Sequence, residues 1–198
     1  YTKSLAVTLI SATLGTGLAT ALSFALLASI TGRSSRWLRL TMPPLLATPH
    51  AAMAVGLAFL VAPSGWFLRL ISPWATGLER PPLWSVAQDP WGLSLAVGLA
   101  LKELPFIILL ALSATQRGHL EPSFRAALSL GYGRYTAFIK VIAPQLAPAM
   151  VLPVAIAFIY GLSAVDMGRV LRPTTPPPFA VLALSKLSDP SAQGWRLG

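Results

Sequence analysis

Two adjacent charged residues, Lys102 and Glu103, stand inside an otherwise apolar run of the sequence. A charge within a membrane span costs about 2.5–3.5 kcal/mol on insertion scales, so such a residue is a functional hypothesis by default. Adjacent residues point about 100° apart on a helix, so these two side chains cannot pair neatly with each other. One interpretation is a proton or ion relay that also includes Asp166. The other is structural: both side chains contact neighbouring helices, or a pocket, near a kink at Pro105.

Other residues that could do chemistry are few. His50 has no second metal ligand nearby, so we interpret it as a packed or hydrogen-bonded histidine rather than a metal ligand or proton carrier. The chain contains no cysteine, which leaves no disulfide framework and no thiolate metal site. The sequence also lacks G-x-x-x-x-G-K-[ST], G-x-S-x-G and H-E-x-x-H motifs. We therefore predict no enzyme, no metal and no cofactor.

The composition is that of a membrane protein. Of 198 residues, 55% are hydrophobic and only 11% are charged, whereas a soluble domain is typically about 25% charged. A net charge of +9 would point to nucleic acid in a soluble protein. Here the basic residues lie between apolar runs, so lipid headgroups are the predicted partner and nucleic acid is not.

Four apolar runs are long enough to cross a bilayer, which takes roughly 20 residues: 4–30, 41–62, 91–114 and 145–165. We expect loops at 31–40 and 63–90, with a short interfacial helix at 64–72. Prolines make the first half of the second run irregular or kinked. Residues 173–178 (PTTPPP) cannot be a membrane helix, and 179–187 are too short to span.

The predicted fold is an all-α membrane protein, a bundle of four to five kinked transmembrane helices. Four tryptophans should mark the membrane–water interface: Trp66, Trp74, Trp84 and Trp91.

Residues 121–144, EPSFRAALSLGYGRYTAFIKVIAP, interrupt the apolar runs with an amphipathic segment. We expect a short helix from about Pro122, a turn at Gly131 and Gly133, and a second helix that ends near Pro144. The segment should lie outside the bilayer. The alternative is an ordinary connecting helix on the membrane surface. One helix face is predicted from the residue spacing: Phe124, Leu128, Gly131, Tyr135, Phe138 and Ile142.

The same segment resembles the EAA loop of ABC importer permeases. That pattern is E-A-A, three residues, Gly, nine residues, Ile, one residue, Leu-Pro. Ala126, Ala127, Gly131 and Pro144 match it, and Val141 replaces Ile. Arg125 stands where Glu is usual and Ala143 where Leu is usual. In the family this loop is a cytoplasmic coupling helix that docks in a cleft of the ATPase. The resemblance assigns docking to Arg125, Ala126, Ala127, Leu128 and Gly131.

The resemblance implies a permease subunit of a type I ABC importer, multi-pass in the bacterial inner membrane. Its partners would be a separate ABC ATPase, a second permease subunit or half, and an extracytoplasmic solute-binding protein. Residues 1–198 would form a single transmembrane domain that stops before its last helix, with Lys102 and Glu103 near the translocation path. The alternatives are an ion-coupled secondary transporter that uses Lys102, Glu103 and Asp166, a membrane enzyme, and a membrane scaffold.

The resemblance also decides the orientation. Alternate loops carry seven basic residues on each side, so the positive-inside rule gives only a slight preference. The set predicted to be cytoplasmic is Arg33, Arg36, Arg39, Arg117, Arg125, Arg134 and Lys140.

Overall fold

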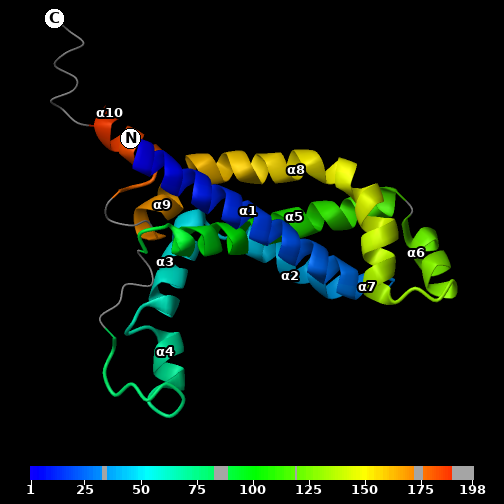
Figure 1. Cartoon of the computed structure of the whole chain (residues 1–198), viewed down its shortest axis with the longest axis horizontal. Coiled ribbons are helices and arrows are strands. Elements are labelled where there is room, and N and C mark those ends of the chain that lie inside the picture. Colours follow the sequence, from blue (N-terminus) through cyan, green and yellow to red (C-terminus); the bar gives the residue numbers. More distant parts are fainter. Residues whose placement is uncertain (33–34, 83–88, 119, 172–175, 189–198) are drawn as a thin grey trace, which may run out of the picture. The chain divides into compact units, whose positions relative to one another are not determined.

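The computed structural model describes residues 1–32, 35–82, 89–118, 120–171 and 176–188, and within these ranges the chain contains helices and no strand (Figure 1). Some residues that entered the sequence predictions lie outside the described ranges: Arg33, Trp84, Arg172 and residues 173–175. The helices in chain order are α1 (Thr2–Ile30), α2 (Arg36–Ala47), α3 (His50–Val61), α4 (Trp66–Ile71), α5 (Leu93–Arg117), α6 (Leu120–Ser129), α7 (Arg134–Ala137), the π-helical turn η1 (Phe138–Ile142), α8 (Ala143–Ser163), α9 (Val165–Leu171) and α10 (Phe179–Leu187).

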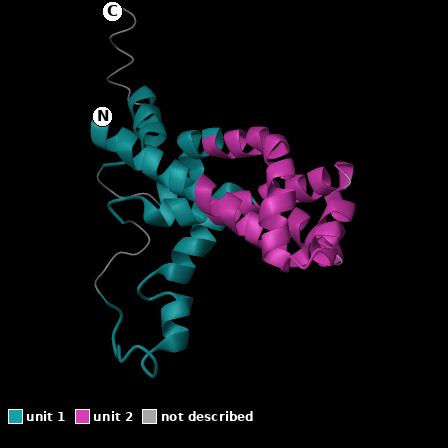
Figure 2. Cartoon of the chain, turned by 45° about the vertical axis from the view of Figure 1, so that its right-hand side comes forward, with its two compact units in different colours: residues 1–15, 49–99, 159–198 teal, residues 16–48, 100–158 magenta. Residues whose placement is uncertain are grey.

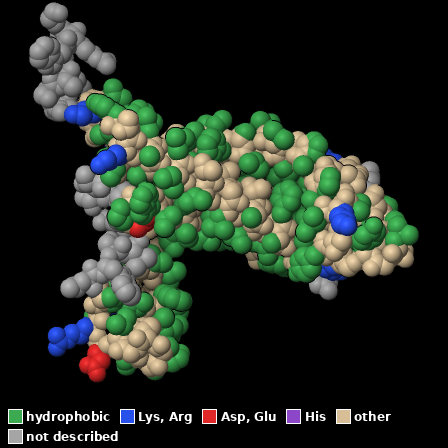
Figure 3. Space-filling model, in the orientation of Figure 1, with side chains coloured by type: hydrophobic (Ala, Val, Ile, Leu, Met, Phe, Trp, Pro, Cys, Tyr) green, Lys and Arg blue, Asp and Glu red, His purple; other side chains and the backbone are tan. Residues whose placement is uncertain are grey.

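Four helical segments among the described residues are long and apolar enough to cross a membrane: Thr2–Ile30, His50–Ile71, Leu93–Arg117 and Arg134–Ser163. Many of their large apolar side chains are exposed, and hydrophobic side chains cover much of the face seen in Figure 3. Exposed apolar surface on this scale is costly in water and suits a lipid environment. The predicted fold class, an all-α membrane bundle, is confirmed.

The chain divides into two compact units, coloured separately in Figure 2. Unit 1 comprises residues 1–15, 49–99 and 159–198, and unit 2 comprises residues 16–48 and 100–158. In unit 1, α3 packs on α9 around a core that includes Leu57 and Met167. Glycine permits close packing there, because a Cβ added to Gly98 would lie 2.5 Å from Leu171 Cδ1. In unit 2, the core includes Phe124 and Phe138, both almost fully buried.

Asp89 fixes the beginning of α5. Its carboxylate accepts hydrogen bonds from the backbone N–H groups of Leu93 and Ser94, both at 2.7 Å, and from the Ser94 hydroxyl at 2.6 Å. Such a side chain satisfies the N–H groups that the first turn of a helix leaves free. Burial raises the pKa of the Asp89 carboxyl, but hydrogen bonds from Ser94, Leu93 and Trp91 outweigh it and hold the pKa below its ordinary value.

The second span differs from the prediction at both ends. Residues 36–40 are helical rather than loop, and α2 continues through Pro43 and Pro44. The helix breaks at Thr48, whose φ of −61° and ψ of 129° are extended, as steric contact with a following proline favours. The spanning segment then runs from His50 to Ile71 and includes α4, the short helix predicted at 64–72.

The prediction that the helix after Gly133 ends near Pro144 is wrong. α7, η1 and α8 follow one another without interruption, so the fourth span begins at Arg134. In η1 the Ala143 N–H donates to Phe138 O, five residues earlier. A π-helical turn shifts the hydrogen-bond register immediately before Pro144, which has no N–H to donate. The proline is therefore accommodated inside the helix instead of ending it.

Candidate functional site

The ten-residue helix α6 has one buried face and one exposed face. Leu120, Phe124 and Ala127 are buried in unit 2. Arg125, Ala126 and Leu128 are exposed. Of the five residues predicted to dock, Ala127 alone points into the protein, and the other four, including Gly131, lie on the accessible side. The exposed face of α6 is therefore available to a partner.

A glycine turn ends α6 as predicted. Gly131 has φ of +86°, a region that L side chains rarely adopt. Its N–H donates to Leu128 O at 3.0 Å, and the Tyr132 N–H donates to Ala127 O at 3.2 Å. This pair of bonds is the Schellman motif of helix C-termini. The single face predicted from spacing does not form: Leu128 and Tyr135 are exposed, whereas Phe124, Phe138 and Ile142 are buried.

Arg125, which departs from the EAA pattern, has a local partner. Its guanidinium Nη2 lies 2.6 Å from Glu121 Oε1, one helical turn earlier. Both side chains are exposed, and ion pairs of this kind contribute roughly 0–1 kcal/mol. The pair is thus weak enough to open when another charged surface approaches, and it places both signs of charge on the exposed face of α6.

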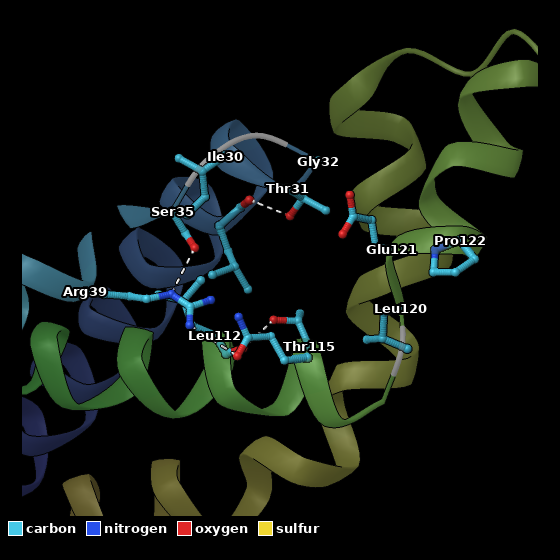
Figure 4. Close-up of a pocket in the computed structure, with 12 residues that line it drawn as sticks. Ile30, Thr31, Gly32, Ser35, Arg39, Leu112, Thr115, Leu120, Glu121 and Pro122 are labelled. Carbon is cyan, nitrogen blue, oxygen red and sulfur yellow. Dashed lines mark hydrogen bonds between the residues drawn. The ribbon is translucent and has the colours of Figure 1, made fainter. Parts of the chain in front are cut away.

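A cavity of about 310 Å³ lies beside α6 within unit 2 (Figure 4). Its walls come from the ends of α1 and α5 and the beginnings of α2 and α6. The Arg39 side chain lines this cavity. Its Nε donates a hydrogen bond to Ser35 Oγ at 3.2 Å, and its Nη1 donates to Gln116 Oε1 at 3.3 Å. Sequence reasoning counted Arg39 only as a basic residue of a predicted loop at 31–40, and it did not single out Gln116. Here the two side chains join α2 to α5.

Lys102 and Glu103 are buried in unit 2, with 2% and 8% of their surface exposed. The ammonium Nζ of Lys102 donates to Leu46 O at 2.7 Å and contacts Leu45 O at 3.5 Å. These carbonyls end α2 just before the break, where Pro49 has no N–H to offer them. The lysine therefore caps the C-terminus of α2, which carries a partial negative charge.

A scan against protein-family models finds no match. The chain is 30% identical over 156 residues, 78% of its length, to the inner membrane ABC transporter permease protein YnjC of Escherichia coli (strain K12). The chain is homologous to ABC transporter permeases. The aligned region covers 29% of that relative, so the chain spans less than a third of the protein it matches. Together with the four apolar segments, the relationship makes this permease homologue a multi-pass inner-membrane protein.

Two other predicted residues occupy different settings in this permease homologue. The His50 ring packs on Tyr160 with centroids 4.4 Å apart, as a packed histidine would. The described residues contain no group of three His, Cys, Asp or Glu side chains that could hold a metal ion. Asp166 is exposed in the first turn of α9, in unit 1, whereas Lys102 and Glu103 belong to unit 2. The relay of all three stays a prediction.

Proposed function

We propose that this chain is the permease subunit of an ABC importer, with residues 1–198 in one transmembrane domain. In this proposal α6 lies in the cytoplasm and docks on a separate ATPase subunit. The chain and a second permease subunit or half form the path for a small solute, which an extracytoplasmic binding protein delivers. The sequence contains no G-x-x-x-x-G-K-[ST] motif, and in this proposal ATP is hydrolysed on the separate subunit.

The observation that carries the proposal is the form and position of α6. It is a short helix with an open face, ended by Gly131, between two of the membrane-crossing segments. The small side chain of Ala126 lets a partner's surface approach the helix backbone closely. Arg125 can leave the Glu121 carboxylate and pair with a carboxylate of the partner, because the exposed ion pair contributes little free energy. Homology to an ABC transporter permease supports the same interpretation.

Adjacent alanines provide a sharp test. Because the chain contains no cysteine, single cysteines can be introduced without background labelling. Ala126 is exposed and Ala127 is 4% exposed, so only the first should reach another protein. We expect Ala126→Cys to cross-link to the ATPase subunit of the assembled transporter, at a yield that changes when ATP is added. Ala127→Cys is the matched control and should not cross-link.

Equal cross-linking of the two variants, or none from either in a complex that hydrolyses ATP, would contradict docking through the exposed face. Uptake driven by a proton gradient, with no ATPase present, would instead favour the ion-coupled transporter that uses Lys102, Glu103 and Asp166. The specific observation behind that second candidate is the burial of Lys102 and Glu103 within a membrane span.

A further inference from the structure

Arg134 joins three helices at one point of unit 2. It is the first residue of α7 and so begins the fourth span. Its Nη1 donates a hydrogen bond to Thr31 O, at the C-terminal end of α1 and 103 residues away in sequence. Carbonyls at that end of a helix lack intrahelical partners and carry partial negative charge. A guanidinium is therefore well suited to hold the end of the first span.

Phe124 brings α6 into the same cluster. The ring is fully buried, and the Arg134 guanidinium carbon lies 5.7 Å from its centroid, within cation–π range. The ring also lies against Gly32, the residue after Thr31. A Cβ added to Gly32 would approach two ring atoms at 3.1 and 3.3 Å, and Gly32 has φ of +73°. The ring thus fits closely between the end of α1 and the beginning of α7.

The cluster lies on the opposite side of α6 from its exposed face. Phe124 is buried, while Arg125 and Ala126 beside it are accessible. Phe124 gives a force applied to the exposed face a direct packed route to Gly32 and Arg134. Packed interiors are stiff and shift between discrete arrangements rather than deforming gradually. A displacement of α6 would therefore reach the ends of α1 and α7 together.

We propose that Arg134 is a positioning residue that ties α6 to the end of α1, so that movement of α6 reaches the first and fourth spans together. This inference rests on the proposed function, because it gives α6 the role of receiving motion from an ATPase. Arg134 contacts neither solute nor nucleotide in this scheme. It acts by fixing the position of the Phe124 ring relative to the backbone of Thr31.

The first experiment measures position without any ATPase. Spin labels on Ala25→Cys in α1 and Ser129→Cys in α6, both exposed and both in unit 2, report the distance between the two helices. We expect a narrow distribution in the otherwise unaltered chain, a broader one with Arg134→Gln, and partial recovery with Arg134→Lys. The control is Lys140→Gln, which removes an exposed cation lying 5.7 Å from the Tyr132 ring centroid and should leave the distribution narrow.

The second experiment measures coupling in the assembled transporter. Loss of a charge-assisted hydrogen bond and its aromatic contact should lower the solute taken up per ATP hydrolysed by about tenfold or more in Arg134→Gln. The ATPase should still co-purify, and Lys140→Gln should keep the wild-type ratio.

The outcomes separate the two proposals. An unbroadened distribution with Arg134→Gln overturns the positioning role, and a broadened one with an unchanged uptake ratio overturns the coupling role. If the unaltered transporter shows no ATP-driven uptake, the proposed function fails, and the spin-label distances alone decide whether Arg134 positions α6.

Discussion

Replacement of Lys102 by methionine tests whether this buried cation caps α2 or acts on a solute path. Methionine keeps much of the length and volume of the side chain and removes its charge. The carbonyl of Leu46 then loses a donor at 2.7 Å, and Leu45 O keeps only the Thr48 N–H at 3.3 Å. Both roles predict impaired transport, but only the cap predicts a loss of stability.

The magnitude follows from the bond and its burial. Hydrogen bonds to charged groups contribute roughly 1.5–3 kcal/mol, whereas polar contacts between membrane helices average only about 0.6 kcal/mol. Lys102 is 2% exposed and its shorter contact is close, so we expect the free energy of unfolding to fall by about 2 kcal/mol. For a chain of this size that lowers Tm by about 4–8 °C.

Thermal unfolding in detergent, followed by tryptophan fluorescence, measures this shift. Lys102→Arg should recover part of it, because a guanidinium can still donate to the carbonyls. Lys186→Met removes an exposed lysine of α10 and should leave Tm unchanged. An unaltered Tm in Lys102→Met would refute the cap. If uptake by the same protein in proteoliposomes were then lost, Lys102 would keep its predicted place beside the translocation path.

Two further predictions concern glycines. Gly131 has φ of +86° and open space around it, so a β-branched side chain there costs about 1–2 kcal/mol through the backbone alone. The Gly131→Val variant should insert into the membrane normally and lose ATP-driven uptake. Gly131→Asn should retain uptake, because asparagine tolerates a positive φ. Wild-type uptake by the valine variant would count against the docking role. A Cβ on Gly15 would meet Leu99 Cβ at 2.9 Å and Ala96 O at 3.0 Å, whereas one on Gly17 would meet nothing within 4 Å. Gly15→Ala should therefore lower Tm, and Gly17→Ala should leave it unchanged or raise it slightly; equal effects on Tm would show that α1 and α5 do not pack as closely as described.

Length and hydrophobicity were sufficient to predict the first and third spans. Residues 4–30 and 91–114 correspond to α1 and α5 within three residues at each end. Both depend on a local property, the removal of apolar surface from water along one continuous helix. The turn at Gly131 was predicted for a similar reason, since the low helix propensity of glycine is also local.

Proline misled the prediction because its effect depends on neighbouring backbone. Pro43, Pro44 and Pro105 lie inside helices, whereas Pro49 follows a break. At Pro144 the π-helical turn absorbs the missing hydrogen bond. In a membrane span, adjacent helices and local changes of register can satisfy the carbonyl that a proline leaves free. Nothing in the residue pattern alone distinguishes these cases.

The partners of the two most informative cations were also beyond sequence reasoning, and for one physical reason. Lys102 donates to carbonyls 56 and 57 residues away, and Arg134 to a carbonyl 103 residues away. In both cases the acceptor is backbone at the C-terminus of another helix, which any residue type supplies equally. Counting charges treated Arg134 as a cytoplasmic marker, and sequence reasoning left Lys102 either near a solute path or in contact with a neighbouring helix. In the structure, the breaks after α1 and α2 leave backbone acceptors, and cations from the third and fourth spans donate to them. In unit 2, the helix breaks that bend the chain are therefore also the points at which its spans are tied together.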